Sequence, residues 1–176
     1  MKIAIFYGST YGNTAAAAEK LSLYLGQMGL EHDLKDIAHS QVEELVAYDK
    51  LLLGCSTWNI GELQDDWQAQ WSRLERLDFH GKQVALFGAG DQLGYGDSFQ
   101  DALGILADML EERGAELVGF WSVEGYEHFK SRGQRGEHFV GLALDDDNQP
   151  HLTDTRIQRW VAQVVQEMGL IAGVRG

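Results

Sequence analysis

The stretch GSTYGNT, residues 8–14, decides the fold because of the two segments that flank it. The run IAIFY at 3–7 precedes it, and four alanines at 15–18 follow it. An apolar run, a glycine-containing loop and an alanine-rich segment predict a buried strand, a tight turn and the start of a helix. Such a turn directs backbone N–H groups and the positive end of the helix dipole toward one point, which favours a bound phosphate.

The phosphate site predicted for this loop uses neutral donors, the hydroxyls of Ser9, Thr10 and Thr14. The loop lacks the lysine that follows the last glycine of a Walker loop, and it lacks the G-x-G-x-x-G pattern of dinucleotide sites. We therefore expect a terminal monophosphate as the ligand. For this loop taken alone, a capped strand-to-helix turn without any ligand is the alternative.

Strand-like and helix-like segments alternate along the chain, as in a parallel sheet with helices on both faces. The predicted strands are 2–7, 31–36, 49–55, 82–88 and 115–121. The predicted helices are 14–28, 41–46, 63–76, 98–113 and 153–168, with N-caps at Thr14 and Ser98 and left-handed C-terminal caps at Gly29 and Gly114. The segment 122–139, rich in glycine and charge, interrupts or follows the fifth strand before the apolar segment 140–144. We expect one doubly wound α/β domain over residues 1–176.

Composition limits the classes of partner. With 27 acidic and 14 basic residues, the formal net charge is -13 and the pI is about 4.7, so nucleic acids and anionic membranes are repelled. Partners should instead present basic patches. The sequence shows no apolar run long enough for a bilayer and no signal-peptide pattern, and its single cysteine, Cys55, fits a reducing compartment. We expect a cytoplasmic, monomeric protein without membrane insertion.

Two further loops follow predicted strands at the edge where parallel sheets bind ligands. STWNIGE, residues 56–62, follows the third strand and carries Trp58, and GAGDQLGYGD, residues 88–97, follows the fourth and carries Tyr95. Trp58 taken alone could be half-buried packing or a stacking surface. Together with the phosphate loop, the two aromatic side chains predict a flat, aromatic, monophosphorylated ligand.

The three loops and the segment VGLALD at 140–145 resemble the flavodoxin family, in its long-chain form, over essentially the whole chain. The resemblance implies a five-stranded parallel sheet of order 2-1-3-4-5, with 122–139 as an insertion that splits the last strand. It implies non-covalently bound FMN and low-potential, one-electron transfer between redox proteins, with replacement of ferredoxin as a further role. Two positions depart from the family pattern, which usually has Thr at Tyr11 and Pro at Ser56.

The resemblance also implies which residues meet the cofactor. The loop 9–14 would hold the FMN phosphate, Trp58 and Tyr95 would sandwich the ring, and Asp147 would lie near the ribityl chain. Backbone groups in the two later loops would meet the polar edge of the ring. The implied cofactor-binding residues are Ser9, Thr10, Tyr11, Gly12, Asn13, Thr14, Ser56, Thr57, Trp58, Asn59, Ile60, Gly61, Ala89, Gly90, Asp91, Tyr95, Ser98, Gln100 and Asp147.

The same loops show no nucleophile with a base partner, no carboxylate pair and no metal-ligand spacing, so we expect neither catalytic residues nor a metal site. The partners implied by the family are ferredoxin-NADP reductase, photosystem I, pyruvate oxidoreductase and nitrogenase. Acidic residues 62, 65 and 66 could steer such a basic partner, or could be an ordinary solvated face.

Two other functions remain as alternatives. An FMN-dependent NAD(P)H:quinone reductase would need one open face of the ring, whereas Trp58 and Tyr95 would cover both faces. A receiver domain would need an acidic pair after the first strand and a phosphoacceptor aspartate after the third strand. This chain has Gly8-Ser9 and Ser56-Thr57 at those places.

Overall fold

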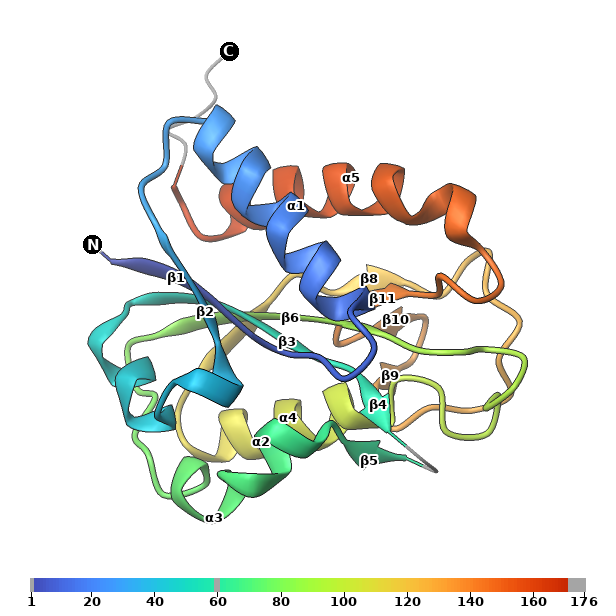
Figure 1. Ribbon diagram of the computed structural model, residues 1–176, viewed down its shortest axis with the longest axis horizontal. Helices are drawn as coiled ribbons and strands as arrows, with labels where there is room; N and C mark the ends of the chain where they lie inside the picture. Colours follow the sequence, from blue (N-terminus) through green and yellow to red (C-terminus); the bar gives the residue numbers. More distant parts are fainter. Residues whose placement is uncertain (1, 59–60, 171–176) are drawn as a thin grey trace.

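The computed structural model describes residues 2–58 and 61–170, and of Trp58 it describes the backbone only. A parallel sheet forms the middle layer of the molecule (Figure 1). Its strands, in the spatial order β2-β1-β3-β6-β11 with β7 beside β6, are β2 (Asp33–Asp36), β1 (Ile3–Gly8), β3 (Lys50–Cys55), β6 (Gln83–Ala89), β11 (Gly141–Leu144) and β7 (Glu116–Val118).

The fifth position of this sheet is filled by two segments in turn. β7 pairs with residues 83–85 of β6, and β11 pairs with residues 86–89 of the same strand. The order 2-1-3-4-5 is therefore confirmed, and so is the split of the last strand. The first half is shorter than the predicted 115–121, because Gly119 adopts φ 79° and ends β7 after Val118.

The chain between β7 and β11 forms a small sheet of its own. Its antiparallel strands are β8 (Trp121–Ser122), β9 (Gln134–Arg135) and β10 (His138–Phe139), in the order β8-β10-β9. Phe139 lies fully buried against Phe99, Tyr126 and His128, with ring centroids 5.0–5.6 Å apart. This aromatic cluster fixes the insertion on the main domain.

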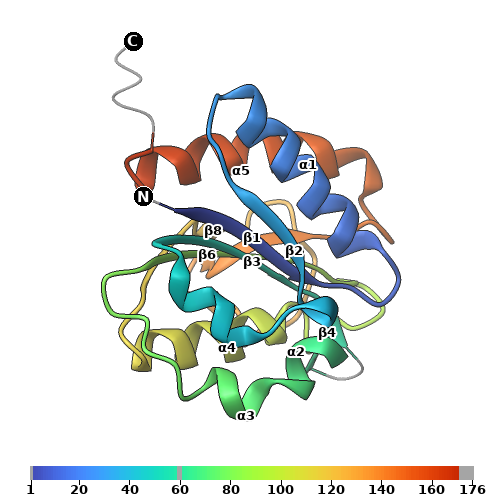
Figure 2. The same ribbon diagram turned by 60° about the vertical axis from the view of Figure 1, so that its left-hand side comes forward.

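Helices cover both faces of the central sheet (Figures 1 and 2). One face carries α1 (Asn13–Gln27) and α5 (Thr153–Glu167), and the other carries α2 (Asp65–Ala69), α3 (Trp71–Leu74) and α4 (Asp101–Glu112). Successive side chains of a strand point to opposite faces. Ile5 accordingly packs into the core under α1 and α5, while Ala4 and Phe6 pack into the core under α4.

Several predicted helix boundaries are wrong. In place of the predicted helix 63–76, a short strand ends at Leu63, and α2 and α3 follow it and meet at Gln70. The predicted helix 41–46 is a 3-10 helix, η2 (Val42–Ala47), preceded by a second one, η1 (Ile37–His39). A third 3-10 helix, η3 (Pro150–Leu152), leads into α5.

The predicted caps are correct only at the C-terminal ends. Gly29 and Gly114 adopt φ 76° and 96°, as expected for left-handed caps. The N-caps, however, are Gly12 for α1 and Gln100 for α4, in place of Thr14 and Ser98. Gln100 takes φ 60°, the one positive φ of a non-glycine residue in the described chain, so the turn of α4 begins only at Asp101.

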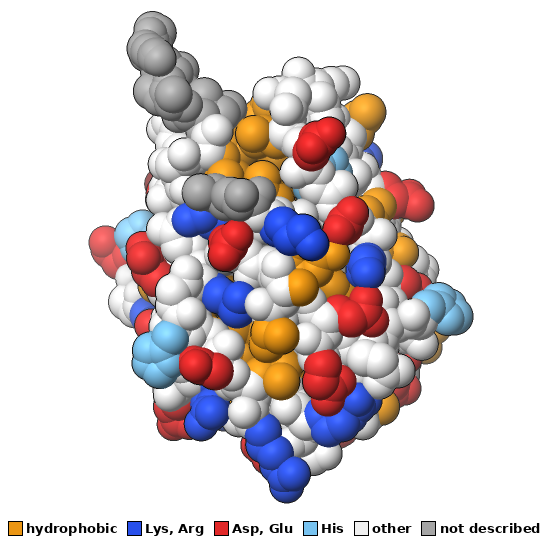
Figure 3. Space-filling model, turned by 90° about the vertical axis from the view of Figure 1, so that its left-hand side faces the viewer, with side chains coloured by type: hydrophobic (Ala, Val, Ile, Leu, Met, Phe, Trp, Pro, Cys, Tyr) orange, Lys and Arg blue, Asp and Glu red, His pale blue; other side chains and the backbone are white. Residues whose placement is uncertain are grey.

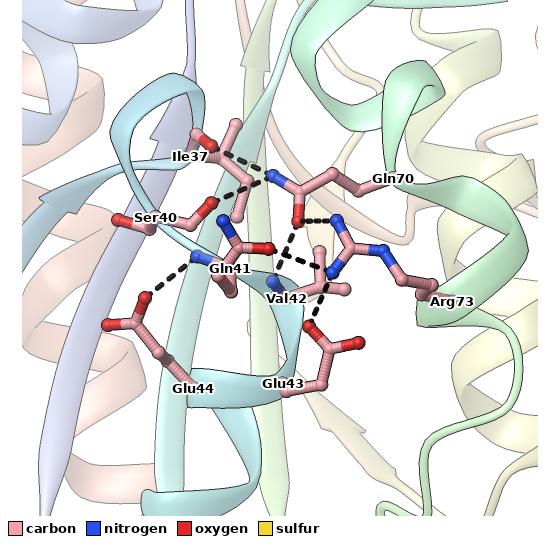
Figure 4. A network of polar contacts seen from close by, with 8 residues as sticks. All are labelled: Ile37, Ser40, Gln41, Val42, Glu43, Glu44, Gln70 and Arg73. Carbon is pink, nitrogen blue, oxygen red and sulfur yellow. Dashed lines mark hydrogen bonds and ion pairs between the residues drawn. The ribbon is translucent and has the colours of Figure 1, made fainter.

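A network centred on Gln70 holds the connection between β2 and β3, where no α-helix forms (Figure 4). The Gln70 amide nitrogen donates to the carbonyls of Ile37 and Ser40, each at 3.0 Å, and its oxygen accepts from the Val42 N–H at 2.8 Å. Arg73 donates to the same oxygen. The side chain of Gln70 thus replaces backbone hydrogen bonds that a regular helix would supply.

We expect Gln70→Leu to lower the free energy of unfolding by about 2–3 kcal/mol, because buried backbone groups lose their partners. Urea unfolding of the full chain measures this loss. Gln68→Leu, at an exposed position of α2, is the matched control and should change the free energy by less than about 0.5 kcal/mol. Equal effects of the two substitutions would contradict this role of Gln70.

Candidate functional site

A cavity of about 370 Å³ opens at the carboxyl edge of the sheet, among the loops that follow β1, β3 and β6. Two antiparallel strands, β4 (Thr57–Trp58) and β5 (Glu62–Leu63), frame the middle loop. The lining residues are Ser9, Thr10, Tyr11, Asn13, Thr14, Ser56, Thr57, Ala89, Gly90, Asp91, Tyr95, Ser98, Phe99, Gln100 and Asp147.

Nearly all the predicted cofactor-binding residues that the structure describes therefore lie around one cavity. Gly12 and Gly61 do not line it: Gly12 caps α1 with φ 94°, and Gly61, with φ 77°, lies against the side chain of Asp101. Asn59, Ile60 and the side chain of Trp58 lie outside the described residues. Phe99 lines the cavity but was not predicted, because an apolar residue between two polar ones gave no signal of a site.

The loop after β1 presents three hydroxyl groups at the N-terminus of α1. Ser9 Oγ accepts from the Gly12 N–H at 3.0 Å, and Thr10 Oγ1 accepts from the Gln64 side-chain amide at 3.3 Å. Thr14 is 1% exposed, and its Oγ1 has no hydrogen-bond partner within the described chain. The first N–H groups of a helix also lack intrahelical acceptors. The loop thus combines several neutral donors that have no acceptor among the described residues, as an anion site requires.

The opposite part of the cavity is lined by the chain around Gly90, which follows β6. A Cβ at Gly90 would come within 3.1–3.2 Å of Gln100 and Phe99, and one at Gly88 would lie 2.3 Å from the Cys55 carbonyl oxygen. Gln100 donates its amide to the carbonyls of Gly88 and Leu144, while its Oε1 is buried without a partner in the described chain. Both glycines are thus packed closely against other protein groups, and Gly90 presents only its backbone to the cavity.

Tyr95 stands at the rim of the cavity, with 52% of its surface exposed. Its backbone N–H donates to the Asp91 carbonyl at 2.9 Å, and the Asp91 carboxylate accepts from the N–H groups of Leu93 and Gly94. These bonds hold the loop in a tight turn and leave the tyrosine ring to cover whatever occupies the cavity.

The described residues that line the cavity include two carboxylates, Asp91 and Asp147, and neither lysine nor arginine. Burial raises the pKa of Asp91, but hydrogen bonds from Gly94, Asn148 and Leu93 outweigh burial and lower the pKa overall. Burial, together with repulsion from the neighbouring carboxylates, raises the pKa of Asp147. The local field therefore disfavours additional negative charge.

Basic side chains stand at the opposite edge of the sheet. Lys2, Lys50 and Lys82 come at or just before the first residues of β1, β3 and β6. Figure 3 shows this face, where lysines and arginines alternate with acidic side chains around apolar patches. Acidic and basic side chains are thus mixed at this edge of the sheet, whereas the described residues that line the cavity are acidic or uncharged.

Asp145, directly after β11, is fully buried. Its carboxylate accepts from the backbone and side chain of Gln92 and from the backbone of Asp147 and Asn148. Asn148 also donates to Asp91, at 2.7 Å. Asp145 therefore fixes the position of Asp147 at the cavity and ties it to the loop after β6.

Cys55, at the end of β3, is fully buried, and burial raises the pKa of its thiol to about 12. A thiol with such a pKa stays protonated at neutral pH and is a poor nucleophile. Within the described ranges, no helix combines the length and apolar character that a membrane span needs.

Comparisons with known proteins agree with this geometry. The family model described as flavodoxin matches residues 5–160. The flavodoxin of Synechococcus elongatus is 48% identical over 169 residues, which are 96% of this chain and 99% of that protein, and the flavodoxin of Klebsiella pneumoniae is 48% identical over 96% of this chain and 95% of its own.

Among solved structures, the Fusobacterium nucleatum flavodoxin bound to flavin mononucleotide superimposes with a TM-score of 0.89 at 31% identity. That match covers 94% of this chain and 98% of the Fusobacterium chain. Oxidised Flavodoxin 2 of Bacillus cereus gives a TM-score of 0.75 at 30% identity, covering 95% of this chain and 99% of its own. The fold, the cavity and the sequence identity of 48% over nearly the full length of the chain show that this chain belongs to the flavodoxin family.

Proposed function

We propose that this chain binds FMN non-covalently in the cavity and carries single electrons at low potential between redox proteins. The observation that carries the proposal is the buried, unpartnered Thr14 hydroxyl beside Ser9 and Thr10 at the N-terminus of α1. Membership of the flavodoxin family and the FMN-bound relative from Fusobacterium nucleatum support the choice of ligand.

The described residues fit the parts of FMN one by one. The hydroxyl loop and the helix N-terminus would hold the phosphate, the backbone at Gly90 would border the flat ring, and Tyr95 would cover one of its faces. Asp147 would lie near the ribityl chain. Stacking by Trp58 and backbone contacts from Asn59 and Ile60 remain predictions from the sequence.

FMN, when bound, supplies the electron-transfer chemistry, and the chain sets the environment in which that chemistry runs. The cavity brings the ligand next to Asp91 and Asp147 and offers no cationic side chain from the described residues. Each added electron therefore meets a field that resists negative charge, so we expect a reduction potential below that of free FMN. A carrier of this kind needs no catalytic side chain.

The partners we propose are redox proteins with basic patches, in the chemical class of ferredoxin-NADP reductase, photosystem I, pyruvate oxidoreductase or nitrogenase. Glu62 and Asp65 are exposed directly beside the hairpin of the cavity, and the net charge of -13 would steer basic partners toward the molecule. In this proposal the chain works as a monomer in the cytoplasm and substitutes for ferredoxin.

Stepwise anaerobic reduction of the purified, flavin-loaded chain by dithionite tests the function. A one-electron carrier should be reduced in two separated steps, and NADPH alone should leave it oxidised. Reduction by NADPH, or a single two-electron step, would favour the quinone reductase. A chain that stays colourless after incubation with FMN would refute the proposal.

The Thr14→Val substitution separates ligand binding from stability. Because the Thr14 hydroxyl has no partner in the part of the chain that the structure describes, its removal should raise the dissociation constant of FMN about tenfold or more, the effect of one hydrogen bond to a charged group. The flavin-free chain should be equally stable or gain up to about 1 kcal/mol, since a buried unpaired hydroxyl is lost. Flavin titration and urea unfolding measure the two quantities.

Thr57→Val is the control for this experiment. Thr57 Oγ1 accepts from the Ala102 N–H at 3.1 Å, so its removal leaves a backbone donor unpaired. We expect this variant to lose about 1 kcal/mol of stability without its ligand. If Thr14→Val destabilised the flavin-free chain by as much, the hydroxyl would have a structural partner and the argument from its isolation would fail.

Asp147→Asn should raise the lower of the two reduction potentials by on the order of 20–40 mV, because one negative charge near the added electrons is removed. Since the pKa of Asp147 is raised, the native carboxylate becomes neutral at a higher pH than an ordinary aspartate, and the difference between the two proteins should vanish as the pH falls through that pKa. Potentiometric titration at several pH values measures both effects. Asp78→Asn, ahead of β6 at the opposite edge, should leave the potential unchanged.

A further inference from the structure

Gln64 connects two of the loops around the cavity although it does not line the cavity itself. The residue is 1% exposed and lies between β5 and α2. Its backbone N–H donates to the Ser56 carbonyl at 3.1 Å, at the base of the β4–β5 hairpin, and its side-chain amide donates to Thr10 Oγ1 at 3.3 Å. A Cβ at Gly8 would lie 2.2 Å from Gln64 Oε1, so the glycine makes room for this side chain.

The orientation of the Gln64 amide is fixed from two sides. Its oxygen accepts from the backbone N–H of Asp66 at 3.0 Å, and a backbone N–H can only donate. Its nitrogen lies 2.7 Å from the Asp66 carboxylate, which can only accept when ionised. Turning the amide over would oppose donor to donor and acceptor to acceptor, so the nitrogen must face Thr10.

The amide orientation determines what the Thr10 hydroxyl can do. Because Thr10 Oγ1 accepts a hydrogen bond from Gln64, its own hydrogen is directed away from Gln64. Thr10 lines the cavity, so this hydrogen remains for a ligand there. Ser9 is in the same state, because its Oγ accepts from the Gly12 N–H.

We propose that Gln64 is a positioning residue for phosphate binding, which fixes the Thr10 hydroxyl as a donor toward the FMN phosphate. The inference rests on the proposed function, because it assumes that the phosphate lies in the loop after β1. Gln64 does not touch the ligand and acts through Thr10. Its effect should therefore appear with FMN and be absent with riboflavin, which has the same ring but no phosphate.

The double substitution Gln64→Glu with Asp66→Asn tests this role, because it exchanges donor and acceptor while the net charge stays the same. Glutamate at position 64 can only accept, so the Thr10 hydroxyl would turn to donate to it, and asparagine at position 66 can supply the amide donor that the pair loses. We expect the dissociation constant of FMN to rise about tenfold or more and that of riboflavin to stay the same. Titration of the flavin-free full chain with each flavin measures the two constants.

Two control variants isolate the path through Thr10. Asp66→Asn alone keeps the bond from Gln64 to Thr10 and removes a negative charge, so it should bind FMN at least as tightly as the native chain does. In a Thr10→Val background, which has no hydroxyl to orient, the exchange should lose most of its effect on FMN. Urea unfolding of the flavin-free variants checks that the exchanged pair remains folded.

Three results would overturn the proposal: unchanged FMN binding in the exchanged pair, equal weakening of FMN and riboflavin, or an undiminished effect in the Thr10→Val background. The first would show that the Thr10 hydroxyl is not used, the second would show a general structural role for Gln64, and the third would show that the exchange acts by a path other than Thr10. A native chain that binds neither flavin would instead refute the proposed function itself, so the two failures are distinguishable.

Discussion

The lack of space at the carboxyl edge of the sheet is the constraint on which the rest of the site depends. β1, β3 and β6 each have a glycine at or next to their end, and none of the three positions has room for a Cβ. At Gly8 the Cβ would meet Gln64 at 2.2 Å, at Gly54 the Phe87 ring at 2.5 Å, and at Gly88 a backbone carbonyl at 2.3 Å. Because the strands are bare there, the loops that follow them can close over the sheet edge and converge on one cavity.

The sequence could predict the features that local patterns determine, but not those that depend on contacts between distant parts of the chain. Apolar runs followed by glycine-rich loops are local patterns, so the strands and the three loops followed from them, whereas the order of the strands came from the resemblance to the flavodoxin family. Three other features depend on partners far away in the chain. They are the end of β7 at Gly119, which bonds to Glu167 and Trp160, the break between α2 and α3 at Gln70, and the late start of α4 at Gln100. The burial of Asp145 likewise follows from hydrogen bonds supplied by another loop, which an acidic sequence pattern does not reveal.

Phosphate binding and a low reduction potential place opposite demands on the charges around the cavity. A lysine beside the phosphate would strengthen binding, but it would also favour negative charge on the nearby ring and raise the reduction potential. The described lining of the cavity avoids this by using hydroxyl and backbone donors, with the basic side chains of Lys2, Lys50 and Lys82 at the opposite edge. Affinity is thus supplied by many weak neutral donors whose dipoles act over a short range.

Neutral donors can replace a cation only if they are held in the donating state. A hydroxyl group donates or accepts with equal ease, and near a dianion it must donate. The chain meets this condition by giving Ser9 and Thr10 hydrogen bonds to accept from Gly12 and Gln64, and by leaving Thr14 with no acceptor in the described protein. The polarity of the loop is therefore set before a ligand arrives, so little reorganisation is needed on binding. In the proposed function Gln64 thus contributes to phosphate binding through Thr10, although it does not line the cavity.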